Sequence, residues 1–357
     1  MQIYSYNSKV VVDSDFSSTV YYVISKQKPG KLFVLVDENT QNVCYPHLYK
    51  LIRDENVFLL TIGQGESNKT MDTVQNIWSF LQQNYCQRND LIINLGGGML
   101  LDVGGFAASA YLRGVPFVHI PTTLLSMVDA SIGGKLGCNF NGKKNQIGFF
   151  KSPEYVIVNP LFLSTLDSRQ LIAGWAEMIK HGLIHSEKHL ERLLGANPLS
   201  LDTQHWEEWI FDSLEIKNDF VVRDPYEAGE RKVLNFGHSL GHAFESLSME
   251  RGDPLLHGEA VAAGLICELY LSSIIEGFPE KILERVVAYI TDLYPLKKLG
   301  EGDEERLFYF MKYDKKNQKD QINFTLLKDM EKPLIDRFAG TTEITKSLRY
   351  YNAQLQH

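Results

Sequence analysis

Residues 91–110 read LIINLGGGMLLDVGGFAASA, and this stretch decides the fold of the first half of the chain. Its apolar start, Leu91–Leu95, predicts a buried strand, and its small residues from Val103 to Ala110 predict a helix. Three glycines, Gly96–Gly98, join the two. Glycine lets the backbone approach a pyrophosphate, and the N-terminus of the next helix offers N–H groups to an anion. The spacing is not GxGxxG, so the turn alone leaves nucleotide binding and tight packing equally open.

The same alternation of strand and helix extends to both sides of this stretch. Apolar runs at Lys31–Val36, Val57–Ile62, Val115–Ile120 and Tyr155–Val158 predict further strands, with helix-length segments between most of them. Consecutive buried strands of this kind form parallel sheets covered by helices on both faces. Such sheets bind ligands at the carboxyl ends of their strands, so we expect binding loops there.

Strand signals become rare beyond residue 165, where segments such as Ser168–Ile184 have helical spacing. We therefore predict two domains. The first, residues 1–165, is a Rossmann-like α/β nucleotide-binding domain, and the second, residues 166–357, is mainly α-helical.

The composition is that of a globular protein, with 357 residues of which 44% are hydrophobic and 22% charged. Four scattered cysteines form no CxxC pair, which predicts free thiols. The net charge of −8 disfavours nucleic-acid binding. We find no basic start followed by an apolar run and no stretch of roughly 20 apolar residues, so we expect a soluble, cytoplasmic protein without a membrane segment.

Basic residues nevertheless gather in glycine-rich segments. Lys135 follows a glycine pair, and Lys143 and Lys144 follow Gly142. Lysines on glycine loops suit phosphate oxygens, because the loop backbone adds N–H donors to the ammonium charge. For any single lysine a solvated loop is the commoner explanation, but together they predict a small anionic substrate.

One carboxylate and three imidazoles could build a metal site. Glu177 and Lys180 are three residues apart on a predicted helix, so both side chains can lie on one face of it. An ordinary surface ion pair would have the same spacing. His238 and His242 are four residues apart on another predicted helix, and His257 adjoins a glycine. An oxygen with two nitrogens suits a zinc-like ion that keeps positions open for substrate. Each histidine could instead be a hydrogen-bonded structural residue, and spacing does not choose among the candidates.

A second set, His181, His185 and His189, forms a still more regular helical stripe. Its neighbours at Ser186–Lys188 are polar, whereas the other histidines adjoin glycines in apolar surroundings. We therefore interpret the stripe as a solvated helix face.

Eight segments follow one another along this chain: GGGMLLDVGGF, YLRG, PTTLLSMVDASIGGK, GKKNQIG, AEMIKHGLI, ERKVLNFGHSLGHAFE, HGEAVAAG and DKKN. Their order is the one found in 3-dehydroquinate synthases. The chain thus resembles the sugar-phosphate cyclase family over about residues 31–320. The resemblance implies a Rossmann-like parallel-sheet domain followed by a mainly α-helical domain, a fold shared with metal-dependent glycerol dehydrogenases.

The resemblance also implies cofactors and the residues that bind them. Zn²⁺ (or Co²⁺) would be held by Glu177, His238 and His257, with His242 as an acid/base group rather than a ligand. The residues that would bind NAD are Asp37, Asn39, Glu66, Lys69, Gly97, Gly98, Asp102, Thr122 and Thr123.

For a sugar-phosphate substrate the resemblance implies two further sets of residues. The catalytic set is Glu227, as a candidate proton acceptor, with His242, Lys180 and Lys217. The substrate-binding set is Arg113, Asp129, Lys135, Lys144, Asn145, Arg231, Asn235 and Lys316, the last favoured over Lys315. Arg113 would reach the phosphate site of the neighbouring subunit in a homodimer.

The implied reaction is that of the shikimate pathway, from 3-deoxy-D-arabino-heptulosonate 7-phosphate to 3-dehydroquinate and phosphate. NAD⁺ oxidises a ring hydroxyl, phosphate is eliminated and the hydride returns, after which ring opening and an aldol step close the carbocycle. Leu101, Leu136 and Cys138 depart from residues common in the family and put local loop geometry in doubt, although they remove no chemical group.

Three alternatives stay open. Another cyclase of inosose or valiolone type would share the NAD, metal and phosphate sites, although Lys135, Asn235 and His242 favour the dehydroquinate branch. A metal-dependent polyol dehydrogenase would release NADH, and the lysines that suit phosphate argue against it. A non-enzymatic interaction protein would bind no metal.

Overall fold

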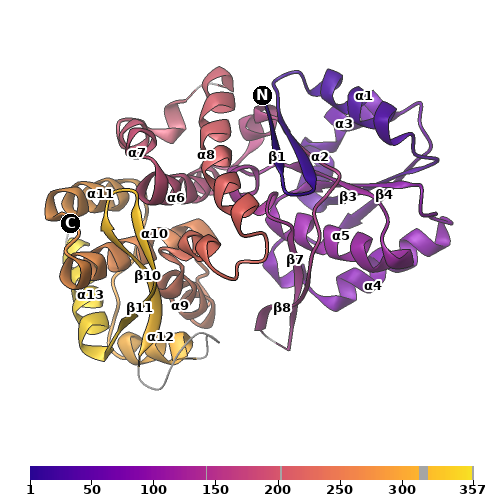
Figure 1. Ribbon diagram of the computed structural model, residues 1–357. Coiled ribbons are helices and arrows are strands. Elements are labelled where there is room, and N and C mark those ends of the chain that lie inside the picture. The colour runs from indigo at the N-terminus through magenta and orange to yellow at the C-terminus, as the bar shows by residue number, and fades with distance from the viewer. Residues whose placement is uncertain (142, 202, 313–320, 356–357) are drawn as a thin grey trace. The chain divides into compact units, whose positions relative to one another are not determined.

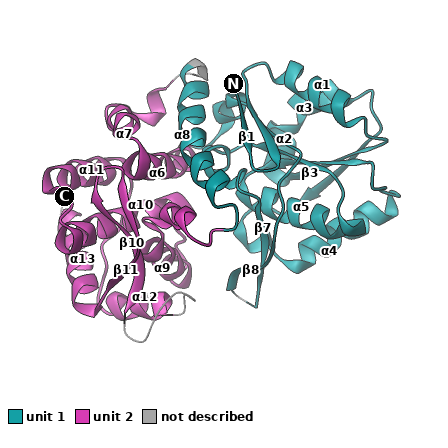
Figure 2. Cartoon of the chain, in the orientation of Figure 1, with its two compact units in different colours: residues 1–167, 202–226 teal, residues 168–201, 227–357 magenta. Residues whose placement is uncertain are grey.

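The computed structural model describes residues 1–141, 143–201, 203–312 and 321–355, without the side chains of Thr203 and Gln204 (Figure 1). The chain forms two compact units (Figure 2). Unit 1 comprises Met1–Asp167 and Asp202–Tyr226, and unit 2 comprises Ser168–Leu201 and Glu227–His357. The predicted boundary after residue 165 lies close to the first division. The return of residues 202–226 to unit 1 was not predicted, because helical periodicity does not say which core a helix joins.

Within the described residues, unit 1 has a seven-stranded sheet in the order β1-β2-β9-β6-β5-β3-β4. All neighbouring pairs are parallel except β1 with β2. The strands are β1 Gln2–Ser5, β2 Ser8–Val12, β3 Leu32–Asp37, β4 Val57–Ile62, β5 Leu91–Gly96, β6 Phe117–Pro121 and β9 Tyr155–Val158. The five predicted strands are present and lie side by side in the parallel part of the sheet, whereas β1 and β2, of which β2 also runs parallel to β9, were not predicted.

Helices cover both faces of this sheet. They are α1 Phe16–Gln27, α2 Glu38–Val43, α3 Tyr45–Ile52, α4 Met71–Gln83, α5 Gly98–Ala110 and α8 Thr203–Arg223. Figure 1 shows α1 and α3 on one side of the strands, with α4 and α5 on the other. Phe33 and Leu35 of β3 pack into the core beneath α4 and α5, with Val74 and Ile77. The predicted Rossmann-like fold class is confirmed.

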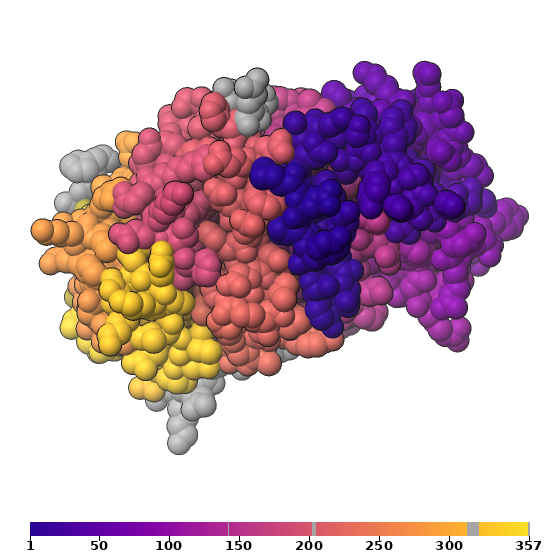
Figure 3. Space-filling view, turned by 45° about the horizontal axis from the view of Figure 1, so that its top comes forward, coloured from indigo at the N-terminus to yellow at the C-terminus, as the bar shows by residue number. Residues whose placement is uncertain are grey.

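Helix α8 packs against the first strands although it is about 200 residues away in sequence. The side-chain amide of Asn218 donates to the carbonyl oxygen of Tyr4 at 3.1 Å. In Figure 3 the indigo N-terminal residues lie directly beside the red surface of this segment. These contacts make α8 part of unit 1.

A separate hairpin, β7 Lys135–Phe140 with β8 Lys143–Phe150, follows the sixth strand of the chain. Sequence patterns did not predict this hairpin. Most side chains of β8 are exposed, and its polar, glycine and apolar residues follow no regular alternation. It carries the lysines singled out in the sequence.

Unit 2 is mainly helical, as predicted, and its described residues also form a β-hairpin that was not predicted. Its helices are α6 Ser168–His185, α7 Glu187–Leu194, α9 His238–Glu250, α10 His257–Leu271, α11 Glu280–Leu293, α12 Asp303–Lys312 and α13 Thr341–Gln354, and its strands are β10 Ile322–Asp329 and β11 Lys332–Ala339. Helix α10 packs against α6, α9, α11, α13 and β10. It is therefore the core element of this unit.

Helix α10 and the turns that follow it, His257–Glu276, are long and apolar enough by composition to cross a membrane. The expectation that no stretch of the chain approaches the apolar length of a membrane span is therefore wrong for this segment. Of its most apolar window, 78% is buried inside the structure. Packing in the core of unit 2 explains its apolar character.

Candidate metal centre and dinucleotide site

The carboxyl ends of three adjacent strands meet at one edge of the sheet in unit 1. Gly96 pairs with Pro121 in the register of β5 and β6, and β3 lies on the other side of β5. The loops after β3, β5 and β6 therefore lie side by side. Dinucleotides bind parallel sheets at such a point, where the strand order reverses.

Asp37 ends β3 and caps α2. Its Oδ1 atom accepts the backbone N–H of Asn39 at 3.0 Å and of Thr40 at 2.7 Å. The side chain of Asn39 is exposed in the first turn of α2. Both predicted NAD residues thus lie in the loop after β3.

Gly97 and Gly98 begin α5, and no side chain caps this helix among the described residues. Gly97 has φ −76°, so its role does not depend on a left-handed backbone. A Cβ atom there would lie 3.3 Å from Thr123 Cγ2, and one on Gly98 would lie 3.3 Å from Ala130. The glycines keep the helix N-terminus open, as an anion site requires.

Thr122 and Thr123 follow β6 beside this helix N-terminus. Thr122 is buried and donates its N–H to the carbonyl of Gly96 at 3.0 Å. The hydroxyl of Thr123 donates to Ser126 at 2.9 Å. The two predicted threonines are thus fixed next to the glycine turn.

Lys69 and Asp102 form an ion pair at 2.5 Å. Burial alone would lower the pKa of Lys69, but Asp102 and Glu66 outweigh it and raise the pKa. Glu66 also accepts a hydrogen bond at 3.0 Å from Asn139 of β7, a residue that the sequence analysis missed. These contacts link helix α5, which carries Asp102, and the segment Glu66–Lys69 to the β7–β8 hairpin.

Lys217 of α8 lies against Asp129, in the helical turn Ser126–Ala130. Its ammonium group is 2.7 Å from the carboxylate and also donates to the backbone oxygen of Asp129. Lys217 is buried. A predicted catalytic lysine and a predicted substrate-binding carboxylate, 88 residues apart in sequence, therefore come together in unit 1.

The remaining predicted cations of unit 1 lie at the ends of the hairpin strands β7 and β8 and on a short helical turn. Lys135 is exposed after Gly133 and Gly134, whose φ values of 95° and 65° favour glycine. Asn145 donates its backbone N–H to the side chain of Asn139, which fixes the β8 end of the hairpin beside the half-buried Lys144. Arg113 is exposed on a short helical turn, also with a positive φ.

In unit 2, helix α6 places Glu177 and Lys180 in direct contact, and both are almost completely buried. Burial alone would raise the pKa of Glu177. Lys180 and His238 outweigh that effect and hold the pKa well below its usual range. Glu177 therefore offers a charged carboxylate inside the protein.

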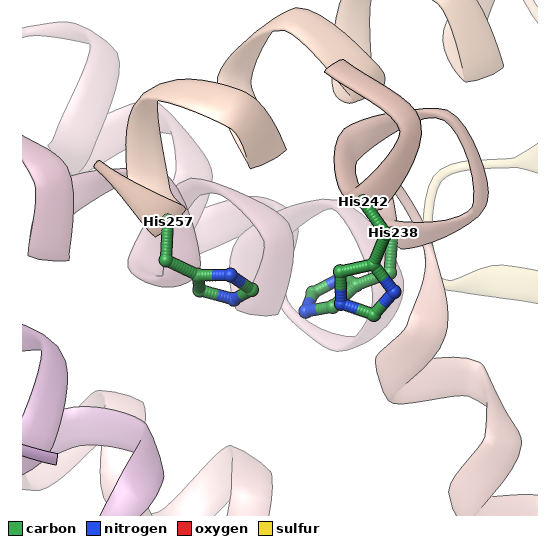
Figure 4. A group of neighbouring side chains, drawn as sticks. All are labelled: His238, His242 and His257. Atoms are coloured by element: carbon green, nitrogen blue, oxygen red, sulfur yellow. The ribbon is translucent and has the colours of Figure 1, made fainter. Parts of the chain in front are cut away.

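Figure 4 shows His238 and His242 of α9 opposite His257 of α10. Each of the three has a ring nitrogen within 4.8 Å of those of the other two. His238 and His257 are half-buried, whereas His242 is exposed. The structure thus gathers all three histidines that the sequence analysis proposed.

Glu177 Oε1 lies 3.5 Å from Nε2 of His238 and 3.5 Å from Nε2 of His257. Two ligands about 2.1 Å from a tetrahedral zinc ion stand about 3.4 Å apart. Both carboxylate oxygens are buried: Oε2 contacts the ammonium group of Lys180, and Oε1 faces the imidazoles of His238 and His257. The donor set fits a divalent metal.

The charges around this point favour a cation. Burial alone would lower the pKa of His257, but Glu177 and Glu245 raise it to about 10. Burial and Lys180 together lower the pKa of His238, so its ring is a neutral nitrogen donor. Glu245 Oε2 is 3.7 Å from the outer nitrogen of His257 and was not singled out in the sequence.

Close contact between α6 and α10 brings these donors together. A Cβ atom on Gly258 would lie 1.7 Å from the carbonyl oxygen of Ala173, so only glycine permits the contact. Arg169 of α6 binds both oxygens of Glu259, at 2.6 and 2.7 Å, in the first turn of α10. This bidentate ion pair, which was not predicted from the sequence, fixes the N-terminus of α10, where His257 lies.

Three other predicted residues lie in the segment before α9. Asn235 donates to the carboxylate of Glu227 at 2.7 Å, and Glu227 has a positive φ of 57°. Arg231 is buried in the same segment. Lys315 and Lys316 lie outside the described residues.

The interpretation of the second histidine set as a solvated face is wrong for two of its members. His181 and His189 are buried, and only His185 is exposed. The set also spans two helices, because α6 ends at His185 and Ser186 caps α7. Polar neighbours misled the assignment, since the chain turns there and His189 faces inward.

His189 gives a pH-dependent prediction. Neither of its ring nitrogens has a hydrogen-bond partner among the described residues, and burial lowers its pKa to about 4. Between pH 4 and 6.5 the unfolded chain therefore binds more protons, and stability falls as pH falls. We expect His189→Leu to raise the free energy of unfolding by about 2 kcal/mol more at pH 5 than at pH 8, measured by urea unfolding. An equal gain at both pH values would contradict a buried neutral ring.

Comparisons with known proteins identify the family. Residues 59–173 match the model of the 3-dehydroquinate synthase N-terminal domain, and residues 174–317 match that of its C-terminal domain. A 3-dehydroquinate synthase of Parabacteroides distasonis is 41% identical over 343 residues, which cover 96% of this chain and 97% of that protein. The chain belongs to the 3-dehydroquinate synthase family.

Solved structures support the fold of this family for the chain. A 2-deoxy-scyllo-inosose synthase, crystallised with carbaglucose-6-phosphate, NAD⁺ and Co²⁺, is 22% identical with a TM-score of 0.88, over 98% of this chain and 99% of that one. The 2-epi-5-epi-valiolone synthase of Streptomyces hygroscopicus, with NAD⁺ and Zn²⁺ bound, is 24% identical with a TM-score of 0.85, over 99% of this chain and 98% of that one. At these identities the likeness concerns the fold alone.

Proposed function

We propose that this protein converts 3-deoxy-D-arabino-heptulosonate 7-phosphate to 3-dehydroquinate and phosphate. Full-length similarity to a 3-dehydroquinate synthase supports the reaction. The observation that carries the proposal for this chain is the convergence of Glu177, His238 and His257, with a charged carboxylate 3.5 Å from two imidazole nitrogens. We propose that the protein acts in the cytoplasm as a homodimer.

The residues of unit 1 would bind NAD at the carboxyl edge of the sheet. The open N-terminus of α5 suits the pyrophosphate, and Asp37 lies where such folds recognise a ribose. The known structures with NAD⁺ and Co²⁺ or Zn²⁺ have the same fold. When bound, NAD would take up and return a hydride, and the divalent metal would acidify the substrate hydroxyl groups.

The other polar groups of the chain would bind the substrate and carry protons. Lys135, Lys144 and Asn145 lie on the hairpin and would hold the phosphate group. Exposed Arg113 would reach the phosphate site of the partner subunit in the homodimer. Their role is to stabilise the negative charge that develops as phosphate leaves.

Protons would move through His242 and Glu227. His242 is the exposed histidine of the cluster and is available as an acid/base group. Glu227 is held at 2.7 Å by Asn235, a hydrogen bond that orients one of its oxygens. The ammonium groups of Lys180 and Lys217 are fixed by Glu177 and Asp129. We expect both lysines to bind substrate oxygens.

A phosphate-release assay tests this proposal. The purified protein is incubated with the heptulosonate phosphate, NAD⁺ and Zn²⁺, and both phosphate and NADH absorbance are followed. We expect phosphate release without net NADH, and loss of at least nine-tenths of the rate after chelation, with recovery on adding Zn²⁺. Net NADH would indicate a dehydrogenase, and full activity of the metal-free protein would overturn the metal assignment.

Substrate choice separates the closest alternative. A parallel incubation with glucose 6-phosphate should release little phosphate. Preference for that sugar phosphate would instead indicate another cyclase of the same fold.

A further inference from the structure

Helix α9, which carries His238 and His242, is capped by a residue from another helix. Gly237 precedes it with φ 79°, and glycine has no side chain to cap the first turn. Glu268 of α10 takes this place, accepting the N–H of Gly237 at 2.6 Å and that of Leu240 at 3.0 Å. The side chain of Glu268 is completely buried.

Close backbone contact between α9 and α10 makes this cap possible. A Cβ atom on Gly264 would lie 2.0 Å from the carbonyl oxygen of Gly237. One on Gly237 would lie 2.8 Å from Leu265 and would also be strained by the positive φ. Glycine at both positions lets Glu268, one turn after Gly264, reach the start of α9.

The cap is connected to His238 through one peptide group. The N–H of Gly237 and the carbonyl of Phe236 belong to the same peptide bond. Nδ1 of His238 lies 3.1 Å from that carbonyl oxygen. A carbonyl has no proton to give, so Nδ1 must be the donor, and in the neutral ring Nε2 then keeps its lone pair. That Nε2 atom is the one 3.5 Å from Glu177 Oε1.

We propose, building on the function proposed above, that Glu268 is a positioning residue for the metal centre. Through the peptide between Phe236 and Gly237 it holds His238 in the Nδ1–H form, with Nε2 directed toward Glu177 and His257. Hydrogen bonds in such a chain polarise one another in a low-dielectric interior. Metal-binding histidines commonly donate their second N–H to a carboxylate or a carbonyl, and here the Glu268 side chain, whose two oxygens accept backbone N–H groups, acts on the carbonyl that receives it.

Glu268→Gln tests this role, because it keeps the shape and places an amide group against one backbone N–H. Ser272→Ala is the matched control. Ser272 is also completely buried and lies one turn further along; it accepts the backbone N–H of Leu327 at 2.9 Å and donates to the backbone oxygen of Glu268 at 2.7 Å, but it does not contact the Glu268 side-chain oxygens that accept from Gly237 and Leu240. Both variants lose a buried hydrogen bond, so both should lose stability.

Two measurements distinguish positioning from stability alone. The first is the Zn²⁺ dissociation constant of the metal-free protein, by competition with a chromophoric chelator. The second is the tautomer of His238, from ¹⁵N spectra of histidine-labelled, metal-free protein. Burial raises the pKa of Glu268 to about 8, so both are made above that pH, where the wild-type group is a carboxylate. NAD affinity serves as the check that unit 1 remains folded.

We expect Glu268→Gln to weaken Zn²⁺ binding about tenfold and to populate the Nε2–H form, with Ser272→Ala unchanged in both. Equal Zn²⁺ affinity and tautomer in the two variants would overturn the proposal and leave Glu268 as a helix cap only. If Glu268→Gln does not fold, the wild-type spectrum tests the proposal. An Nε2–H form of His238 in the wild type would overturn it, because that form cannot donate from Nδ1 to the carbonyl of Phe236. Wild-type protein that binds no Zn²⁺ would refute the proposed metal centre, whereas the tautomer comparison would still decide the role of Glu268.

Discussion

His257→Ala is expected to remove tight Zn²⁺ binding, whereas His242→Ala should retain Zn²⁺ and lower turnover by about 10² to 10⁴. His257 Nε2 lies 3.5 Å from Glu177 Oε1, a separation that suits two ligands of one ion. His242 belongs to the same cluster but is exposed, as a proton carrier in contact with substrate would be. The two substitutions should therefore affect different properties.

Metal content after dialysis and the rate of phosphate release measure the two effects. Both variants should bind NAD like the wild type, because its proposed site lies in unit 1. Loss of metal from His242→Ala together with full metal in His257→Ala would reverse the assignment of the two imidazoles. His242→Ala with wild-type turnover would exclude His242 from proton transfer.

Glu177→Ala is expected to lose the metal and to destabilise the protein by about 3 to 5 kcal/mol. Lys180 is almost completely buried against Glu177, so removing the carboxylate leaves a buried charge without its counter-ion. Replacing both partners, as Glu177→Leu with Lys180→Met, should recover most of the lost stability because no buried charge remains. The double variant should still bind no metal and have no activity.

Urea unfolding and metal content test this prediction together. The exposed pair of Glu191 with Arg285 is the matched control, and Glu191→Ala should change stability by no more than about 1 kcal/mol. A double variant as unstable as Glu177→Ala would show that packing rather than an unpaired charge causes the loss. Retention of Zn²⁺ by Glu177→Ala would remove Glu177 from the ligand set.

Much of the fold was predictable because its signals are local. The apolar runs that became β3, β4, β5, β6 and β9 predict strands wherever they occur, and the glycines of Gly96–Gly98 mark the turn into α5. The β7–β8 hairpin and the packing of α8 were not predictable in this way. Exposed strands lack an apolar pattern, and helical spacing does not reveal that α8 packs against the first strands.

The candidate site was predictable in its residue types and less so in its arrangement. Residue chemistry singled out Glu177, His238, His242 and His257 as possible donors, and only the family resemblance separated His242 from the other three. The structure brings the carboxylate and the imidazoles together. The second histidine set shows the limit of this reasoning, since polar neighbours suggested exposure while His189 is buried. Neighbours in sequence do not report which way a side chain faces once a helix ends.

The sequence by itself determined the parallel α/β unit, the helical unit and the donor types of a metal centre, because these depend on local periodicity and side-chain chemistry. Only the tertiary structure decided how the donors converge. Gly258 allows α6 and α10 to touch, which places Glu177 beside His257. Glu268 joins α10 to the first turn of α9 through contacts between residues about 30 positions apart. Such contacts depend on close packing of helix backbones, and no local pattern in the chain specifies them.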